Sequence, residues 1–340
     1  MKPNTVTIGK VSEVAGVSKT TVSRYLNGKY EHMSEKTKNR IKAVIEALDY
    51  RPNAVARSLK SQKTGLIGVI VSDVTNPVTI HLIKGIIDYS TQEGYQVITA
   101  SSDETPAKEH EYILSMMDRQ VEGLVVVIAD YNRFSLLESL QARGASIVLA
   151  DRTINKPVFD MVTTDNYTMT KHAIKTLYDM GFEAVGLFSS DLLRSTVRIA
   201  RYNAFLSQSK THIQAPEELV YILQNDLEEG YQKALTDFKA KYYGKKTAAF
   251  ASTPMAMLNL LGAAHELGIR IPEDLGVCGY DNLRWSRLIS GGISVIEQPF
   301  YEVGTESAKI LIKRIRNEIS GDPQYIELRS KMILRNSTNI

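Results

Sequence analysis

The sequence predicts an α/β protein with a small all-helical head followed by two lobes, each a doubly wound parallel sheet. Three observations predict it: a basic N-terminal segment with short capped helices, a long region in which apolar runs alternate with helical stretches, and a length of 340 residues. Nine such runs are too many for one compact sheet, so two lobes with a ligand cleft between them are expected. A TIM barrel is the alternative.

The head is distinguished first by its charge. Residues 1–63 hold 13 Lys/Arg and 5 Asp/Glu, a formal charge of +8, whereas the remaining residues hold 28 and 33, a formal charge of −5. A small basic segment joined to a mildly acidic body is typical of a nucleic-acid-binding module fused to a second domain.

Helix start and stop signals in the head are closely spaced. Thr7 is placed to cap a first helix over 8–15, which Gly16 ends. Ser18 is placed to cap a second helix over 19–26, which Asn27-Gly28 ends, and Ser34 to cap a longer third helix. Two short helices around a glycine turn, with a third helix to pack on, predict a helix-turn-helix. Residues 52–60 predict a further short helix, and 61–65 a linker.

From residue 66 the pattern changes to alternating strands and helices. Expected strands are 66–71, 95–100, 123–129, 146–150, 184–188, 219–223, 248–251, 275–280 and 293–296. Stretches of helical length between them include 77–93, 106–121, 166–181, 197–210, 228–241 and 254–268. Nearly continuous apolar strands separated by helices favour parallel sheets covered on both faces.

Several classes of protein are disfavoured. The sequence has no apolar run long enough to span a membrane, no signal-like N-terminus, and one cysteine, Cys278, so a cytoplasmic location is expected. The six histidines include no pair at metal-ligand spacing, and phosphate-binding, dinucleotide-binding and nucleophile-elbow motifs are absent. We therefore expect no enzyme activity, no metal and no cofactor.

The head contains a recognisable string of residues. Residues 15–28, AGVSKTTVSRYLNG, closely resemble the DNA-binding head of the LacI/GalR family, and the likeness continues through 48–59, LDYRPNAVARSL. The resemblance implies a type I periplasmic-binding-protein-like body, so that it spans nearly the whole chain. It also implies a head over 1–60, a sensor over 66–340, a first lobe of about 66–163 plus 299–325, and a second of about 164–298 plus 326–340.

The second helix is the expected reading helix. Side chains on its N-terminal turns can reach base edges in the major groove, and by resemblance Lys19, Thr20 and Arg24 occupy the base-reading positions. Predicted phosphate contacts are Ser18, Thr21, Ser23, Tyr25 and Asn27. Lys19 and Thr20 differ from the lactose repressor's pair, and Lys10 stands where many relatives have aspartate.

The segment after the third helix predicts a second DNA contact. At about eight residues it is marginal as an isolated helix. By resemblance it is a hinge helix that enters the minor groove through Asn53, Ala56, Leu59 and Lys60, with Leu59 as a wedge. The alternative is that Leu59 packs on Val55.

The expected effector site lies between the lobes. By resemblance its residues are Ser72, Val78, Thr79, Asp151, Arg201, Ser252, Asp281, Trp285 and Gln298. An arginine with carboxylates suits a polyhydroxylated ligand, and Arg201 can equally bind the carboxylate of a sugar acid. Trp285 or Tyr280 is available to stack on a sugar face. The sequence departs from the family at Ser252-Thr253, where relatives carry Asn-Asp.

The predicted function is a dimeric, ligand-gated regulator of transcription, most simply a repressor of carbohydrate-utilisation genes acting on a near-palindromic operator. No C-terminal heptads support a tetramer. Two alternatives stay open: a purine- or nucleoside-sensing repressor, and a transport-type sugar-binding protein. The latter has no use for the basic head.

Overall fold

The computed structural model describes residues 6–50, 64–223 and 228–339. Contacts divide the chain into two units, one ending at Thr64 and the other beginning at Gly65, and each is described by itself. The hinge helix predicted over 52–60, with Asn53, Ala56, Leu59 and Lys60, lies outside the described residues, as does most of the linker.

The head is a three-helix unit. Its helices are α1 (Ile8–Ala15), α2 (Lys19–Leu26) and α3 (Glu35–Ala47). Hydroxyls begin each of them as expected, because Thr7, Ser18 and Ser34 accept from backbone N–H groups three residues on. Gly16 ends α1 with φ of 60°, in the left-handed region that glycine enters without strain. The core is Val11, Ala15, Val22, Ile41 and Tyr50.

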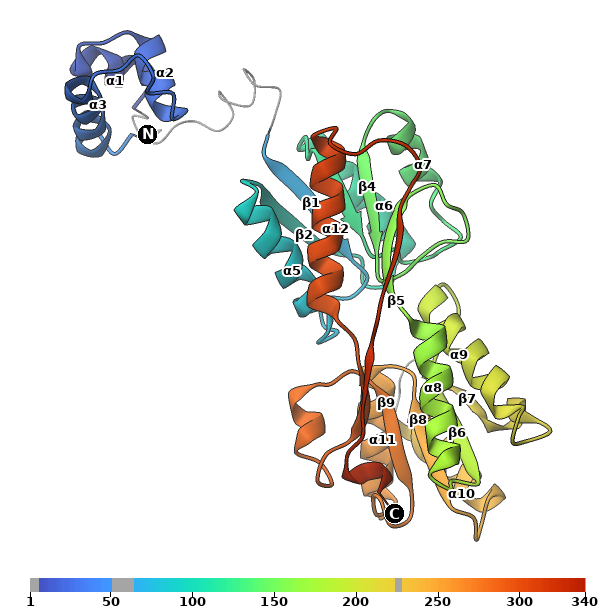
Figure 1. Cartoon of the computed structure of the whole chain (residues 1–340). Helices are drawn as coiled ribbons and strands as arrows, with labels where there is room; N and C mark the ends of the chain where they lie inside the picture. The colour runs from blue at the N-terminus through green and yellow to red at the C-terminus, as the bar shows by residue number, and fades with distance from the viewer. Residues whose placement is uncertain (1–5, 51–63, 224–227, 340) are drawn as a thin grey trace. The chain divides into compact units, whose positions relative to one another are not determined.

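The body contains two six-stranded sheets (Figure 1). The first has the order β11-β5-β4-β3-β1-β2, and all its strands are parallel. Its strands are β1 (Leu66–Val71), β2 (Gln96–Ser101), β3 (Gly123–Val126), β4 (Ser146–Ala150), β5 (Asp160–Thr164) and β11 (Tyr325–Leu328). The first lobe therefore reaches Leu328, three residues past the expected boundary.

The second sheet has the order β12-β10-β9-β8-β6-β7, with β12 antiparallel to β10. Its strands are β6 (Ala184–Ser190), β7 (Val220–Leu223), β8 (Thr247–Ala251), β9 (Gly276–Tyr280), β10 (Ser294–Glu297) and β12 (Lys331–Ile333). Two separate sheets, the first parallel and the second parallel except for β12, confirm the two-lobe expectation and exclude the TIM barrel.

Helices cover the sheets. In the first lobe they are α5 (Thr79–Gln92), α6 (Pro106–Asp118), α7 (Ser135–Ala142) and α12 (Phe300–Ile315); in the second, α8 (Asn166–Asp179), α9 (Thr196–Ser209), α10 (Glu228–Lys241) and α11 (Pro254–Glu266). Side chains of β1 point alternately to the two faces of the first sheet, and helices cover both faces. Ile67, Val69 and Val71 pack on the α5 and α12 side, and Ile70 packs on the α6 and α7 side.

Helices α5 and α12 lie side by side, although more than 200 residues separate them in the sequence (Figure 1). Two glycines permit their close approach. A Cβ on Gly85 would stand 2.1 Å from the Tyr301 carbonyl oxygen, and one on Gly304 would stand 2.1 Å from that of Leu82. The first lobe is thus closed by a helix from the C-terminal part of the chain.

Candidate functional sites: the reading helix and the interlobe cavity

The exposed face of α2 is made of the residues predicted to read bases. Val22 alone is buried in this helix, and Lys19, Thr20 and Arg24 are all exposed. Packing of Val22 on α1 and α3 fixes which face of the helix turns outward. The arrangement presents two cations and a hydroxyl from one short helix, which suits a major groove.

The residues predicted to contact phosphate largely hold the ends of the same helix. Ser18 Oγ accepts from the Thr21 N–H at 3.1 Å and lies 2.9 Å from Thr21 Oγ1. At the other end, Asn27 Nδ2 donates to the Ser23 carbonyl at 2.8 Å. Tyr25 is partly buried against the head core. These side chains therefore position the helix, whatever contacts they make to DNA.

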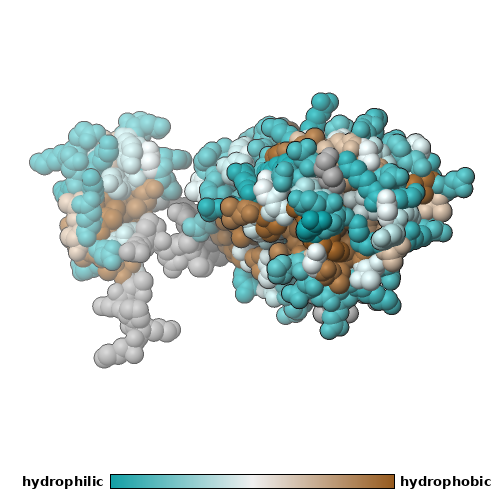
Figure 2. Space-filling view, turned by 90° about the horizontal axis from the view of Figure 1, so that it is seen from below, coloured by the Kyte–Doolittle hydropathy of each residue, from teal (hydrophilic) through white to brown (hydrophobic). Residues whose placement is uncertain are grey.

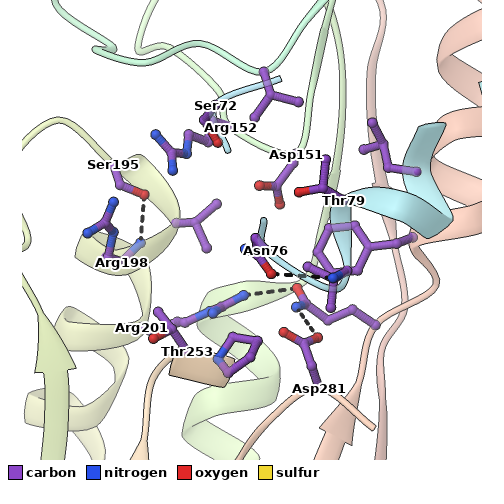
Figure 3. Close-up of a pocket in the computed structure, with 17 residues that line it drawn as sticks. Ser72, Asn76, Thr79, Asp151, Arg152, Ser195, Arg198, Arg201, Thr253 and Asp281 are labelled. Carbon is purple, nitrogen blue, oxygen red and sulfur yellow. Dashed lines mark hydrogen bonds between the residues drawn. The ribbon is translucent and has the colours of Figure 1, made fainter. Parts of the chain in front are cut away.

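A cavity of about 70 Å³ lies within the body, where the carboxyl ends of strands from both sheets meet. Ser72 follows β1, Asp151 follows β4, Asp281 follows β9 and Gln298 follows β10. This edge is where open α/β sheets bind ligands. Figure 3 shows the lining, which is Ser72, Asn76, Val78, Thr79, Leu82, Val127, Asp151, Arg152, Ser195, Val197, Arg198, Arg201, Thr253, Pro254, Asp281, Gln298 and Phe300.

Arg201, on α9, is the centre of the polar network in this cavity. It is 3% exposed and lies over the Tyr280 ring, with 3.4 Å between its Cζ and the ring centroid. Its guanidinium donates to Asn166 Oδ1 at 2.8 Å, to the Ser252 carbonyl at 2.5 Å and to Gln298 Oε1 at 3.0 Å. The arginine is therefore held rigidly by uncharged acceptors.

Gln298 joins this arginine to a carboxylate. Its Nε2 donates to Asp281 Oδ1 at 2.8 Å, and its Oε1 also accepts from Thr164 Oγ1 at 2.8 Å (Figure 3 draws the first of these bonds). Thr164 and Gln298 lie on two of the chain segments that cross between the lobes. The cavity and the crossover segments thus share one hydrogen-bond network.

Each lobe contributes one carboxylate to the cavity: Asp151 is half-buried, and Asp281 is buried. Both have left-handed backbones, with φ of 63° and 79°, immediately after a strand. Burial raises the pKa of Asp281 to about 6, Arg201 and Gln298 oppose that rise, and Asp151 adds to it. Burial likewise raises the pKa of Asp151, against the effect of Arg152. Asp151 Oδ1 is buried without a hydrogen-bond partner among the described residues.

Seven of the nine predicted effector residues line the cavity, and two do not. The Ser252 hydroxyl turns away to Ser189 Oγ at 2.6 Å, and only its carbonyl serves the site by holding Arg201. Trp285 is half-buried against the core of the second lobe, so it offers no stacking face to the cavity. The ring face of Tyr280, the other aromatic candidate for stacking, is covered by the guanidinium of Arg201.

Sequence reasoning missed several polar lining residues. Asn76, Arg152, Arg198 and Thr253 all face the cavity (Figure 3). Arg152 and Thr253 are each next in sequence to a predicted residue, so adjacency was an available signal. Arg198 lies one helical turn before Arg201 on α9, a spacing that places both on one face.

A second cavity, of about 280 Å³, adjoins the first. The two share Val78, Asp281, Gln298 and Phe300. Arg329 and Lys331, on the third crossover segment, also line it.

Comparison with known proteins decides the family. Residues 7–53 match the family model described as bacterial regulatory proteins, lacI family, and residues 174–338 match a periplasmic binding protein-like domain. The chain is 37% identical over 334 residues to the HTH-type transcriptional regulator KdgR of Bacillus subtilis, with 97% of each chain covered. The chain belongs to the LacI family.

Two further similarities agree with this assignment. The HTH-type transcriptional regulator PtxS of Pseudomonas putida is 31% identical over 98% of this chain and 96% of its own. The structure of the Lac repressor dimer bound to operator and the anti-inducer ONPF matches the fold with a TM-score of 0.83 at 20% identity, covering 98% and 99% of the two chains. This LacI-family protein is a DNA-binding regulator of transcription, as its sequence predicted.

In the part of the chain that the structure describes, no helix is both long and apolar enough to cross a membrane.

Proposed function

We propose that this LacI-family regulator represses carbohydrate-utilisation genes, and that a sugar or sugar acid in the interlobe cavity sets its affinity for a near-palindromic operator. The observation that carries the proposal is the cavity itself. Its polar lining comes from both lobes and from the Gln298 crossover, so a bound ligand contacts every part that has to move when the lobes rearrange.

The lining suits hydroxyl and carboxyl groups. Three of the five N–H donors of Arg201 bind described acceptors, which leaves two for a ligand. Asp151 Oδ1 offers a buried acceptor to a hydroxyl donor. A polyhydroxylated molecule supplies donors to the carboxylates and acceptors to the arginines within one small volume.

A purine effector is less well supported. A purine ring is usually bound between apolar or aromatic faces, and Phe300 is the single aromatic residue among those lining the cavity. The small Val78 and Thr79 stand on the first-lobe wall. The purine-sensing alternative therefore has one aromatic ring, that of Phe300, on which a base could stack in this cavity.

In the head, we propose that Lys19, Thr20 and Arg24 read bases in the major groove. Contacts to phosphate, which set the position of the head along the duplex, are assigned to Ser18, Thr21, Ser23, Tyr25 and Asn27. Contacts in the minor groove are assigned to Asn53, Ala56, Leu59 and Lys60. Exposure of Lys19, Thr20 and Arg24 on one helix supports the first assignment.

A homodimer is part of the proposal, because a near-palindromic operator needs two reading helices related by a two-fold axis. The body carries apolar side chains in contact with solvent, and Figure 2 shows such side chains gathered in patches on one face. Exposed examples are Ile80 and Ile87 on α5 and Met255 and Leu258 on α11. Sedimentation of the full chain at micromolar concentration tests the dimer.

The deciding experiment is a thermal-shift screen of the full chain against neutral sugars, sugar acids, sugar phosphates and purines, followed by operator binding with each hit. A ligand at 100 times its Kd adds about 2.7 kcal/mol to the free energy of unfolding. Stabilisation by a sugar or sugar acid that also changes DNA affinity supports the proposal. A purine hit overturns the carbohydrate assignment, and a hit without an effect on DNA binding overturns the gating.

A further inference from the structure

The side-chain carboxylate of Glu104 contacts two arginines that line the cavity. It lies in the loop after β2, where its backbone has φ of 56° and its N–H donates to the Ser72 carbonyl at 2.7 Å. Its Oε2 accepts from Arg152 Nη1 at 2.7 Å, and its Oε1 accepts from Arg152 Nη2. Oε1 also accepts from Arg198 Nη2 at 3.4 Å.

These two arginines line the cavity, and they come from different lobes. Arg152 follows β4 in the first lobe and is 7% exposed, whereas Arg198 is on α9 in the second. Glu104 therefore makes an ionic contact between the lobes. Nearby, the Thr153 N–H donates to Thr196 Oγ1 at 3.1 Å, and that hydroxyl lies 3.1 Å from the Thr153 carbonyl oxygen.

Electrostatics keeps Glu104 charged. Burial acts to raise the pKa of its carboxyl, but the hydrogen bonds and charges of Arg152 and Arg198 outweigh burial and bring the pKa below its ordinary value. One carboxylate thus neutralises two of the three arginines of the cavity. The third, Arg201, has uncharged hydrogen-bond partners.

From this geometry we propose that Glu104 is a specificity-determining residue: its carboxylate occupies the positions on Arg152 and Arg198 that an effector's acid group would take. An acid group that enters the cavity displaces Glu104 from Arg198 and so releases this ionic contact between the lobes, whereas the longer interlobe contact between Arg194 and Asp130, at 3.9 Å, stays in place. A neutral sugar leaves that contact in place. The inference rests on the proposed function, because it concerns the ligand of the same cavity.

The first test is Glu104→Gln in the full chain, with affinities measured for two acid and neutral pairs, gluconate with sorbitol and glucuronate with glucose. Removing the competing charge is expected to tighten acid binding about tenfold, the lower end of what one adjacent charge does to an ionic equilibrium, and to leave neutral binding unchanged. Glu111→Gln, on the exposed face of α6, removes the same charge from the same lobe and controls for net charge. Glu104→Asp keeps the charge and is expected to restore the weaker acid binding.

The second test needs no ligand. Spin labels at Arg143→Cys and Asn203→Cys, both exposed, report the distance between the lobes, and the native Cys278 does not react because burial raises its pKa to about 12. In a Thr196→Val background, which removes the neighbouring hydrogen bonds, Glu104→Gln is expected to broaden the distance distribution.

The outcomes separate the two proposals. Tighter acid binding by Glu104→Gln together with a broader distance distribution supports the role of Glu104. Unchanged acid binding, or an unchanged distribution in a folded variant, overturns it. If none of the four probes binds either protein, the sugar or sugar-acid assignment is contradicted, and the distance measurement alone decides whether Glu104 links the lobes.

Discussion

The polar side chains of the reading helix and those of the interlobe cavity differ in exposure and in bonding. On α2, Lys19, Thr20 and Arg24 are exposed to solvent, while buried Val22 packs the helix against the rest of the head. In the cavity, Arg201 is buried and already bound to three acceptors. In the proposed function, DNA is therefore read by side chains that have no bonds to other described residues to give up, whereas an effector joins a hydrogen-bond network that already links the two lobes. A ligand that favours one arrangement of that network shifts the structure toward it.

The largest expected effect is on the buried arginine. Arg201→Met is expected to lower the free energy of unfolding by about 3 to 5 kcal/mol, because buried acceptors on Asn166, Ser252 and Gln298 lose their donor. Urea unfolding of the full chain measures it. A variant as stable as the parent would mean that the network is not the rigid part of the cavity.

The next largest expected effect is a pH dependence of stability, caused by a buried carboxyl outside the cavity. Glu109, 3% exposed on α6, accepts from the Ala129 N–H at 2.6 Å, and burial raises its pKa to about 7. The folded protein then holds a proton that the unfolded chain releases near pH 4.5, so this residue makes stability fall as pH rises from about 4.5 to 7.

Glu109→Gln removes that dependence. The parent is expected to lose up to about 3 kcal/mol relative to the variant between pH 4.5 and 8, at 1.36 kcal/mol per pKa unit. Unfolding free energies of both proteins across this range give the difference, in which the other titrating groups cancel. Parallel curves would show that Glu109 ionises normally.

The exposed arginine is expected to behave in the opposite way to the buried one. Arg24→Ala should cost about 1 to 3 kcal/mol in the discrimination between operator and scrambled DNA, with stability unchanged within about 0.5 kcal/mol. Lys42→Ala, which removes a charge from the exposed side of α3, is the control. It should weaken both DNAs alike, and the same pattern in Arg24→Ala would refute base reading.

The smallest effect concerns the start of the reading helix. Ser18→Ala removes the hydroxyl that caps α2 and is expected to destabilise it by about 1 kcal/mol. Amide hydrogen exchange of α2 in the full chain detects this as faster exchange confined to the head. Equal exchange in both proteins would assign Ser18 to phosphate contact alone.

Prediction from sequence succeeded where one signal acts locally. Strands with continuous apolar runs, such as β1 and β4, and helices with hydroxyl caps, such as α1 to α3, lie close to where they were expected. β5 was not expected, because three of its five residues over Asp160–Thr164 are polar. Its one carboxylate, on Asp160, is bound by Arg314 from α12. β11 and β12 are short and partly exposed, so their sequences lack a buried run.

The cavity shows the same limit. Residues that follow strands, such as Asp151 and Asp281, were predictable from the family resemblance, and the strand ends that meet at one edge of each sheet explain why they line the cavity. The orientations of Ser252 and Trp285 were not, since each depends on a contact within the second lobe that the sequence does not record. Glu104 was not predicted because it does not line the cavity itself, and its carboxylate acts there through Arg152 and Arg198.

The glycine contact between α5 and α12 has a consequence for biosynthesis. The first lobe takes β1 to β5 from the early part of the chain but needs α12 and β11 to cover α5 and to flank β5. The second lobe draws most of its strands from the intervening residues. On the ribosome, the lobe that begins first is therefore finished after most of its neighbour has emerged, and a premature stop before Phe300 leaves both the Gly85 face and the β5 edge without a partner.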